Sequence, residues 1–483
     1  MMHGTAPPPT PLAGTPDVAP SPPTPSTPPA DLAEAVRQLR RGAVLVVGDA
    51  MLDRYVYGRV ARVSPEAPVP VLAVEREVAL PGGAGNVVRN LTALGAAVAF
   101  VSVVGDDQAG SDLTGLIGGQ PGVEPWLLVE GGRATTTKTR FVAAGQHMLR
   151  ADHEQLTPVQ PRLAERLVRI AADAVAATAV MALSDYSKGT LAGDVPARLI
   201  AAARKAGRKV AAAPRGADLS RYAGADLVLL DAAELALAAG MQAGGGDAEA
   251  VVVAAASLRA AHGFGAVMVL RSESGVTLVE EDGAAAHHWP TGALETVDWA
   301  GTGDAVLAVA ACGLAAGLPL PTVARLGALA AGIVVGKSGI AVVREDEFLE
   351  ALVPGRQAAR KLASRAQAAE RVERWRRDGF RVGLLTAETA AAYPHLVDEP
   401  RSWCDRLVVG VPEAALTAER FAALGGVDLV ARYGADGVLD LIRLLRPDVL
   451  VQDPAGAPDT VAGGEILQEW GGTVRKPEPS PVA

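Results

Sequence analysis

A small-residue turn runs directly into an apolar stretch at Trp299-Ala300-Gly301-Thr302-Gly303-Asp304. Gly301 and Gly303 let the backbone approach a ligand closely, and the N-terminus of the helix that follows offers N–H groups to an anion. A carboxylate at the mouth of such an anion site is well placed to take a proton from a hydroxyl that attacks a phosphate. The alternative is an ordinary glycine turn in which Asp304 only caps the helix.

Two further groups of residues could bind hydroxyls. Asp49 and Asp53 follow the first apolar strand, where carboxylates could hold sugar hydroxyls. The run from Pro81 to Asn86 places Gly82 and Gly83 before a helix, and the Asn86 amide can donate and accept at once, as a sugar diol requires. Each feature could instead be a tight turn with a capping side chain.

Cations and acidic loops complete the candidate set. Lys138, Arg140 and Arg150 lie in one β-like stretch with Gln146 and Asp152, and cations close together suit a phosphate carried by a substrate. Arg271, Glu273 and Gly275 follow one strand and form a plausible nucleotide-contacting loop. Asp231 and Glu234 follow another strand, where they could hold a metal-bound water. Alternatively, the cations lie on an ordinary solvated face, and Glu234 is only a carboxylate at the start of a helix.

The elements that must position these residues follow an alternating pattern. Short apolar runs are separated by amphipathic stretches, which predicts an α/β fold with a mostly parallel sheet. The expected strands are 43–49, 97–105, 179–184, 209–213, 227–230 and 266–270. Ligands of such sheets bind at the carboxyl ends of the strands. Residues 56–74 and 135–152 interrupt the alternation as short β-strands, which predicts a small β-lid over that edge.

The length of 483 residues and the changes in composition along the chain predict two domains. Residues 1–30, rich in Pro, Thr and Ala, are expected to be a disordered tail. The first domain is expected over 31–353, a helical linker over 354–370, a second α/β domain over 371–476 and a tail over 477–483. The expected strands of the second domain are 381–385, 406–410, 427–430 and 449–451.

Charge and composition exclude several classes of protein. The net charge of -9 is spread without long runs, which argues against a nucleic-acid or membrane-surface partner. The two cysteines give no disulfide framework or zinc pattern, and there is no apolar run of membrane-spanning length. Because the N-terminus also lacks the features of a secretory signal, we expect a cytoplasmic enzyme.

Taken together and in order, the motifs resemble those of the ribokinase-like (PfkB) carbohydrate kinases. Among these, the chain is most similar to the kinase part of the bifunctional heptose 7-phosphate kinase/heptose 1-phosphate adenylyltransferases. The stretches that carry this resemblance are 48–55, 63–71, 81–86, 183–189 and 331–337. The run Ser64-Pro65-Glu66-Ala67-Pro68-Val69-Pro70 is more specific than the glycine motifs. The resemblance implies a ribokinase-like domain with a β-lid, then a smaller Rossmann-like domain of nucleotidyltransferase type.

The resemblance also implies a role for each matching residue. Asp304 would be the base on the anomeric hydroxyl, and the N–H groups over 300–303, with the catalytic Gly301 and Gly303, would hold the charge on the transferred phosphoryl group. The implied sugar-binding residues are Asp49, Asp53, Gly82, Gly83, Asn86, Lys138, Gln146 and Arg150. ATP would contact Arg271, Glu273, Gly275, Gly301, Thr302 and Gly303, and Mg²⁺ would be reached through water from Asp231 and Glu234.

Several positions depart from the family pattern. Ala213-Pro214-Arg215 stands where Asp-Pro-Lys is usual, Asp231 begins the motif that usually starts with Asn, and Ala300 replaces a Thr. In the second domain the stretch Ala392-Tyr393-Pro394-His395 stands where adenylyltransferases carry His-x-Gly-His. We therefore expect the second domain to be degenerate and unable to transfer AMP.

The expected function is an ATP-dependent kinase that converts heptose 7-phosphate into the 1,7-bisphosphate, for ADP-heptose synthesis, and that forms homodimers. The alternatives are a kinase for another sugar and a non-catalytic sensor of sugar phosphates or nucleotides. Ala213 and Ala300, which lack the usual polar groups, favour the sensor.

Overall fold

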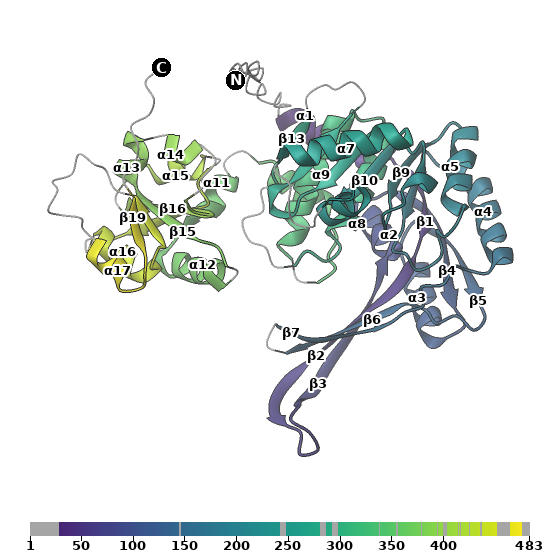
Figure 1. The fold of residues 1–483 in the computed structure, drawn as a ribbon, viewed down its shortest axis with the longest axis horizontal. Helices are drawn as coiled ribbons and strands as arrows, with labels where there is room; N and C mark the ends of the chain where they lie inside the picture. Colours follow the sequence, from purple (N-terminus) through teal and green to yellow (C-terminus); the bar gives the residue numbers. More distant parts are fainter. Residues whose placement is uncertain are drawn as a thin grey trace, which may run out of the picture.

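The computed structural model describes residues 29–143, 146–241, 248–280, 286–291, 298–337, 339–353, 356–377, 379–393, 395–398, 403–413, 415, 417–424, 426–434, 437–451 and 464–475. Within these residues the chain forms two α/β units and a separate four-stranded sheet (Figure 1). The expected tails lie almost wholly outside this part of the chain. Only residues 29 and 30 of the N-terminal tail fall within it, and they begin α1.

The first unit is built on a sheet with nine described strands in the order β13-β12-β11-β10-β9-β8-β1-β4-β5. β12 pairs antiparallel with both β11 and β13 at one edge, and the other described pairs are parallel. The bounds are β1 Ala43–Gly48, β4 Ala97–Gly105, β5 Val123–Glu130, β8 Val180–Ser184, β9 Lys209–Ala213, β10 Leu227–Asp231, β11 Ala266–Leu270, β12 Val276–Val279 and β13 His287–Trp289.

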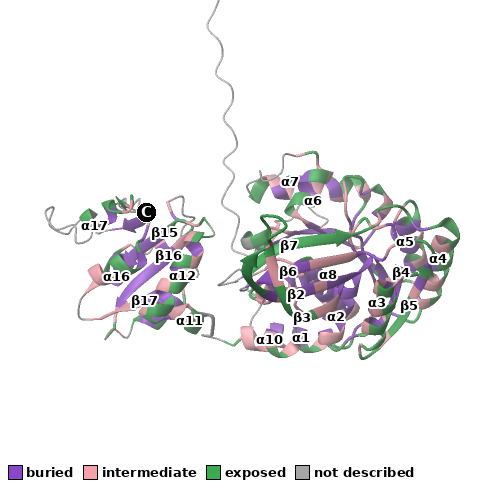
Figure 2. Ribbon diagram, turned by 90° about the horizontal axis from the view of Figure 1, so that it is seen from below, coloured by how far each residue is buried: buried purple, intermediate pink, exposed green. Residues whose placement is uncertain are grey.

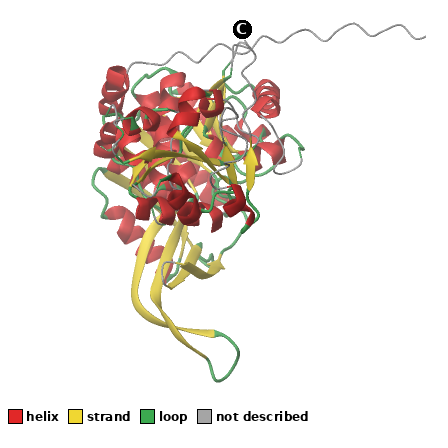
Figure 3. Cartoon of the chain, turned by 90° about the vertical axis from the view of Figure 1, so that its left-hand side faces the viewer, coloured by secondary structure: helices red, strands yellow, loops and turns green. Residues whose placement is uncertain are grey.

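Helices cover both faces of this sheet (Figure 3). The reason is visible in β1, where Val44 and Val46 belong to one apolar cluster and Leu45 and Val47 to another. Because alternate residues of a strand point to opposite faces, an unbroken apolar strand needs cover on both sides. The helices are α1 Pro29–Leu39, α2 Ala84–Ala93, α3 Gln108–Gly118, α4 Pro161–Val175, α5 Val195–Lys205, α6 Ala232–Ala238, α7 Ala248–His262, α8 Thr302–Ala315, α9 Leu320–Val335 and α10 Glu345–Ala351, with short 3-10 turns η1 Ser220–Tyr222 and η2 Ser272–Ser274.

The lid is a sheet of four strands in the order β3-β2-β6-β7: β2 Ala50–Val63, β3 Pro70–Gly83, β6 Thr137–Ala143 and β7 Gln146–His153. The prediction of a β-lid is confirmed, but β2 and β3 have 14 residues each and are not short. Their far ends project from the body (Figure 3). β7 is exposed along its whole length, whereas β4 in the central sheet is largely buried (Figure 2).

The second unit has six described strands, all parallel, in the order β14-β17-β16-β15-β18-β19. The bounds are β14 Leu362–Ala363, β15 Val382–Thr386, β16 Arg406–Pro412, β17 Leu429–Tyr433, β18 Val449–Val451 and β19 Thr473–Arg475, with helices α11 Arg356–Lys361, α12 Arg365–Arg377, α13 Ala387–Ala392, α14 His395–Asp398, α15 Ala418–Ala422, α16 Val438–Leu445 and α17 Gly464–Gln468. This arrangement is consistent with a Rossmann-like domain.

The prediction of a helical linker over 354–370 needs correction, because part of this segment belongs to the sheet of the second unit. Leu362 and Ala363 pair with Val430 and Ala431 of β17, so the segment supplies an edge strand of the second unit. The expected strands of the two α/β units match those observed to within three residues at each end. The unpredicted strands β5, β12, β13, β14 and β19 lie at or next to sheet edges, and four of them have four residues or fewer. Short edge strands carry little periodic signal.

No helix of the described residues is long and apolar enough to cross a membrane.

Candidate active site

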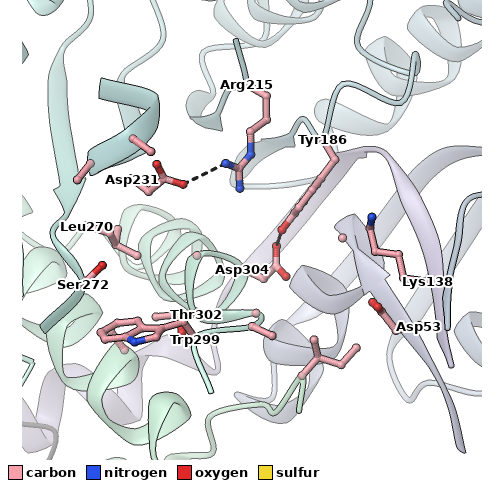
Figure 4. Close-up of a pocket in the computed structure, with 18 of the residues that line it drawn as sticks. Asp53, Lys138, Tyr186, Arg215, Asp231, Leu270, Ser272, Trp299, Thr302 and Asp304 are labelled. Atoms are coloured by element: carbon pink, nitrogen blue, oxygen red, sulfur yellow. Dashed lines mark hydrogen bonds and ion pairs between the residues drawn. The ribbon is translucent and has the colours of Figure 1, made fainter. Parts of the chain in front are cut away.

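A cavity of about 640 Å³ opens at the carboxyl ends of the strands of the first unit, where the sequence placed the site. Figure 4 shows Asp304 between two groups of side chains: Lys138 and Asp53 on one side, and Asp231, Leu270, Ser272 and Trp299 on the other. The lid and the two loops after β9 and β10 therefore face the N-terminus of α8 across one cavity.

The turn before α8 is built as its glycines predict. Gly301 adopts a left-handed conformation with φ 78°, and a Cβ there would lie 2.7 Å from Asn86 Nδ2, so a side chain is excluded on both grounds. α8 then begins at Thr302, and Asp304 lies in its first turn. First-turn N–H groups have no partner within a helix, which suits an anion. Here the Thr302 N–H donates to Trp299 O at 3.2 Å and the Ala300 N–H to Asp298 Oδ1 at 2.9 Å, while Gly301 and Gly303 line the cavity.

Asp304 is almost completely buried, with 5% of its surface exposed. Its Oδ1 accepts a hydrogen bond from the Tyr186 hydroxyl at 2.6 Å, and its Oδ2 accepts one from Asn86 Nδ2 at 2.9 Å. Burial raises the pKa of Asp304 to about 6, against the opposing effect of these two hydrogen bonds. A carboxylate with this pKa is ionised at neutral pH and still basic enough to accept a proton.

The lid supplies the charges on the other side of Asp304. Asp53 is buried and forms an ion pair with Arg140. Lys138 Nζ lies 2.9 Å from Asp152 Oδ2, and Arg150 Nε lies 2.9 Å from Asp152 Oδ1. Burial raises the pKa of Asp53, and the Arg140 guanidinium opposes that rise. Asp53, Lys138 and Arg150, with Gly83, are among the predicted sugar-side residues that line the cavity.

Other predicted sugar-side residues have structural roles. Asp49 is buried, and its two oxygens accept backbone N–H groups of Tyr186, Lys188 and Thr190. It fixes the loop after β8 and is not a lining residue, so the structure does not support a direct sugar contact. Gly82 packs on Asp53, where a Cβ would collide with the carboxylate.

The amide of Asn86 faces Asp304, whereas Gln146 is exposed on β7 and does not line the cavity.

The predicted nucleotide loop is only partly at the cavity. Gly275, Thr302 and Gly303 line it, together with Ser272, whose φ is 48°. Arg271 is not a lining residue, and the side chain of Glu273 lies outside the described part of the structure. Apolar side chains of Leu270, Val276 and Trp299 complete this end of the cavity.

The predicted metal pair is engaged by a cation. Arg215 Nη1 lies 3.0 Å from Asp231 Oδ2 and 2.8 Å from Glu234 Oε1. Among the described residues, no three His, Cys, Asp or Glu side chains are grouped so that they could hold a metal ion. Asp231 lines the cavity with 43% of its side chain exposed, so it fits a contact through water with Mg²⁺ on a nucleotide. Glu234 does not line the cavity.

The lining residues that were not predicted as site residues include Tyr186 and Arg215. Arg215 lies two residues beyond β9, and Tyr186 lies two residues beyond β8. Their positions just beyond strand ends were the available signal, because that edge of a parallel sheet is where ligands bind.

Comparison with known proteins agrees with this geometry. The model of the pfkB family carbohydrate kinases matches residues 42–346. The chain is 53% identical over 464 residues to the bifunctional protein HldE of Acidiphilium cryptum, covering 92% of this chain and 94% of the relative. It is 45% identical over 467 residues to the bifunctional protein HldE of Paramagnetospirillum magneticum, again covering 92% and 94%.

Solved structures show the same fold for the first unit. Arabidopsis thaliana ribokinase, complexed with ribose and ATP, matches with a TM-score of 0.52 and 19% identity, over 65% of this chain and 98% of that chain. Escherichia coli phosphofructokinase-2, in complex with fructose-6-phosphate, matches with a TM-score of 0.52 and 17% identity, over 65% and 98%. From the family match and the HldE relatives, the chain belongs to the pfkB family of carbohydrate kinases and is an ATP-dependent sugar kinase.

Proposed function

We propose that this kinase transfers the γ-phosphoryl group of ATP to the anomeric hydroxyl of D-glycero-D-manno-heptose 7-phosphate. The observation that carries the proposal is the position of Asp304, between the N-terminus of α8 and the cations of the lid. The HldE relatives and the motifs of the heptose 7-phosphate kinases support the choice of sugar. Lys138, Arg140 and Arg150 supply positive charge for a substrate that already carries a phosphate.

In this proposal Asp304 accepts the proton of the anomeric hydroxyl as its oxygen attacks the γ-phosphorus. The N–H groups at the start of α8, with Gly301 and Gly303, stabilise the charge on the transferred group. Asp53 and Gly83 hold the sugar near Asp304, Asn86 orients the Asp304 carboxylate, and Lys138 and Arg150 receive the 7-phosphate. Mg²⁺ bound with ATP neutralises charge on the phosphates.

Arg215 is a cation that lines the nucleotide side of the cavity. It lies over the ring of Tyr186, 5.3 Å from the ring centre, and it pairs with Asp231 and Glu234. We propose that it exchanges part of this pairing for the ATP phosphates when nucleotide enters. This chain carries an Arg here, and its planar guanidinium can hold a carboxylate and a phosphate oxygen together.

A phosphoryl-transfer screen tests the substrate. Purified protein with ATP is offered heptose 7-phosphate, fructose 6-phosphate and ribose, and ADP formation is measured for each. The proposal expects the highest kcat/KM with heptose 7-phosphate and a bisphosphate product. A preference for either of the other sugars would show a kinase with a different substrate, and ATP binding without ADP formation would favour the sensor.

We also propose that the second unit does not transfer AMP. β15 leads into α13, where the Thr386 side chain accepts the Thr389 N–H and so occupies the start of that helix. The stretch that matches the usual histidine motif ends at His395, and no other histidine occurs from 386 to 395. Without such groups, the described residues at this strand end offer no histidine anchor for the phosphates of ATP.

The test uses the full chain with Asp304→Asn, which silences the proposed kinase base, and supplies heptose 1-phosphate and ATP. We expect pyrophosphate release at the level of the no-enzyme control. Release at a rate typical of an adenylyltransferase would contradict the proposal. A known adenylyltransferase run in parallel shows that the assay detects the reaction.

The partner that we propose for this chain is a second copy of itself, joined through the lid. Large apolar side chains are exposed on its strands and their connecting loop: Val60, Val63, Val69, Val74 and Leu149. Exposed apolar groups on one sheet are typical of an interface. Light scattering should give a dimer that Val63→Glu weakens, and a wild-type monomer would contradict this. A cytoplasmic location stays a prediction.

A further inference from the structure

Two tyrosines of the first unit, the half-buried Tyr186 and the buried Tyr222, each donate a short hydrogen bond to a buried aspartate. The Tyr186 hydroxyl lies 2.6 Å from Asp304 Oδ1, and the Tyr222 hydroxyl lies 2.6 Å from Asp185 Oδ2. Only the first pair lines the cavity. Figure 4 shows the Tyr186 ring running from the edge of the cavity to Asp304. The two pairs therefore have the same chemistry but different relations to the proposed reaction.

The backbone of Tyr186 is held from several directions. Its N–H donates to Asp49 Oδ2 at 2.8 Å, and the next residues do the same, with Ser187 N bonded to Asp185 Oδ1 at 2.7 Å and Lys188 N bonded to Asp49 Oδ2 at 3.0 Å. Ser187 has a left-handed φ of 55°, which a serine rarely adopts. A loop fixed in an uncommon conformation by two buried carboxylates places the phenol accurately.

The other oxygen of Asp304 is fixed through a second chain of contacts. Asn86 Nδ2 donates to Oδ2, and Arg89 Nη1 donates to Asn86 Oδ1 at 2.9 Å, which orients the amide so that its N–H faces the carboxylate. Both bonds favour the ionised form of Asp304. The charged groups that also face it are Arg89 from α2, Asp53 from β2 and Arg215 from the loop after β9.

Of these groups, Tyr186 alone joins the base to the nucleotide side of the cavity. Its hydroxyl bonds to Asp304, and Arg215 lies over its ring. Burial and the nearby Asp304 charge raise the pKa of Tyr186 well above its usual value, so its hydroxyl keeps its proton and stays a donor at neutral pH.

We propose that Tyr186 is a positioning residue of the kinase reaction, whose hydroxyl holds Asp304 ionised and turned toward the attacking sugar hydroxyl. This inference rests on the proposed role of Asp304 as the base. Tyr186 itself contacts the reaction only through that carboxylate. Removing its hydroxyl removes a charge-assisted hydrogen bond from a buried anion, so protonation of Asp304 becomes easier.

The test compares Tyr186→Phe with Tyr222→Phe, measuring kcat, KM for ATP and kcat/KM from pH 5 to 9, together with melting temperature. We expect Tyr186→Phe to move the acid limb of kcat/KM upward by about one pH unit. On the plateau we expect kcat to fall about tenfold, because the carboxylate is less well oriented, with KM for ATP unchanged. Tyr222→Phe should lower the melting temperature and leave the limb in place.

An unshifted acid limb in Tyr186→Phe, with only a lower melting temperature, would overturn the inference. If that variant does not fold, a ring-fluorinated tyrosine at 186 replaces it. Its more acidic hydroxyl is a stronger donor and should move the limb downward, and an unmoved limb again overturns the proposal. Asp304→Asn separates the two claims. Turnover at the wild-type rate in Asp304→Asn shows that Asp304 is not the base. Low turnover in Asp304→Asn, combined with an unshifted acid limb in Tyr186→Phe, overturns only the role of Tyr186.

Discussion

The two units share one architecture but differ at the carboxyl ends of their strands. Both are largely parallel sheets covered by helices. In the first unit the loops after β9 and β10 and the start of α8 bring Arg215, Asp231 and Asp304 to one cavity. In the second unit β15, β17 and β18 end at Thr386, Tyr433 and Val451. A parallel sheet of this kind provides a scaffold for ligand binding, and the side chains at the carboxyl ends of its strands determine which reactions it can support.

Three aspartates of the second unit lie at the opposite edge of its sheet. Asp405, Asp428 and Asp448 each accept a backbone N–H from the start of a neighbouring strand, at 2.7 Å in each case. Asp226 does the same for Val210 in the first unit, at 2.8 Å. These carboxylates satisfy amides at the amino ends of the strands. Their position far from the carboxyl ends marks them as structural.

The largest expected effect sharpens this contrast directly. Asp304→Asn should lower kcat by about 10²–10⁴-fold, because the general base is lost while the shape is kept. Asp448→Asn removes a carboxylate of the second unit and should leave kinase turnover unchanged. Steady-state ADP release measures both variants. Normal turnover in Asp304→Asn would show that Asp304 is not the general base. Reduced turnover in Asp448→Asn would show that the two units are coupled.

A second prediction concerns the lid. Arg140→Ala leaves the buried Asp53 without its partner and should lower the free energy of unfolding by about 3–5 kcal/mol. Arg59→Ala breaks the exposed Arg59–Glu75 pair and should change it by at most about 1 kcal/mol. Urea unfolding followed by circular dichroism compares the two variants. Equal losses would mean that the Asp53–Arg140 pair does not stabilise the lid.

Removing the cation of the nucleotide side should have a smaller effect. Arg215→Ala should reduce kcat/KM for ATP by about 10–100-fold, the range expected for a charge-assisted hydrogen bond. Arg215→Lys keeps the charge and should lose less, since only the planar geometry is gone. Initial rates over a range of ATP concentrations give the comparison. If Arg215→Ala binds and turns over ATP normally, the cation serves only Asp231 and Glu234.

The last prediction concerns the dependence of stability on pH. Because the pKa of Asp304 is raised from 3.8 to about 6, the folded state binds its proton more tightly than the unfolded state does. Its contribution to stability is therefore complete below pH 4 and is lost as pH rises to about 6, by at most about 3 kcal/mol. The difference in unfolding free energy between wild type and Asp304→Asn should fall over that window. A flat difference would contradict the raised pKa.

The sequence by itself determined the local frame of this protein. Unbroken apolar runs such as 43–48 and 266–270 can only be strands covered on both faces, and their ends located the cavity. The glycine turn at 301–303 required a left-handed residue and a helix start, so the position of Asp304 followed. The strands and the glycine turn depend mainly on residues close to them in the sequence, and sequence patterns describe such local relations well.

Only the tertiary structure decided the partners of the charged residues. In the folded chain, Asp49 accepts hydrogen bonds from the 186–190 loop, and Arg215 pairs with Asp231 and Glu234. The Tyr186 hydroxyl donates to Asp304, which lies 118 positions away in the sequence. Each of these residues satisfies a local rule for ligand binding equally well. Which carboxylate remains available to a substrate depends on contacts between distant segments, and a buried charge takes whichever partner the packing brings to it.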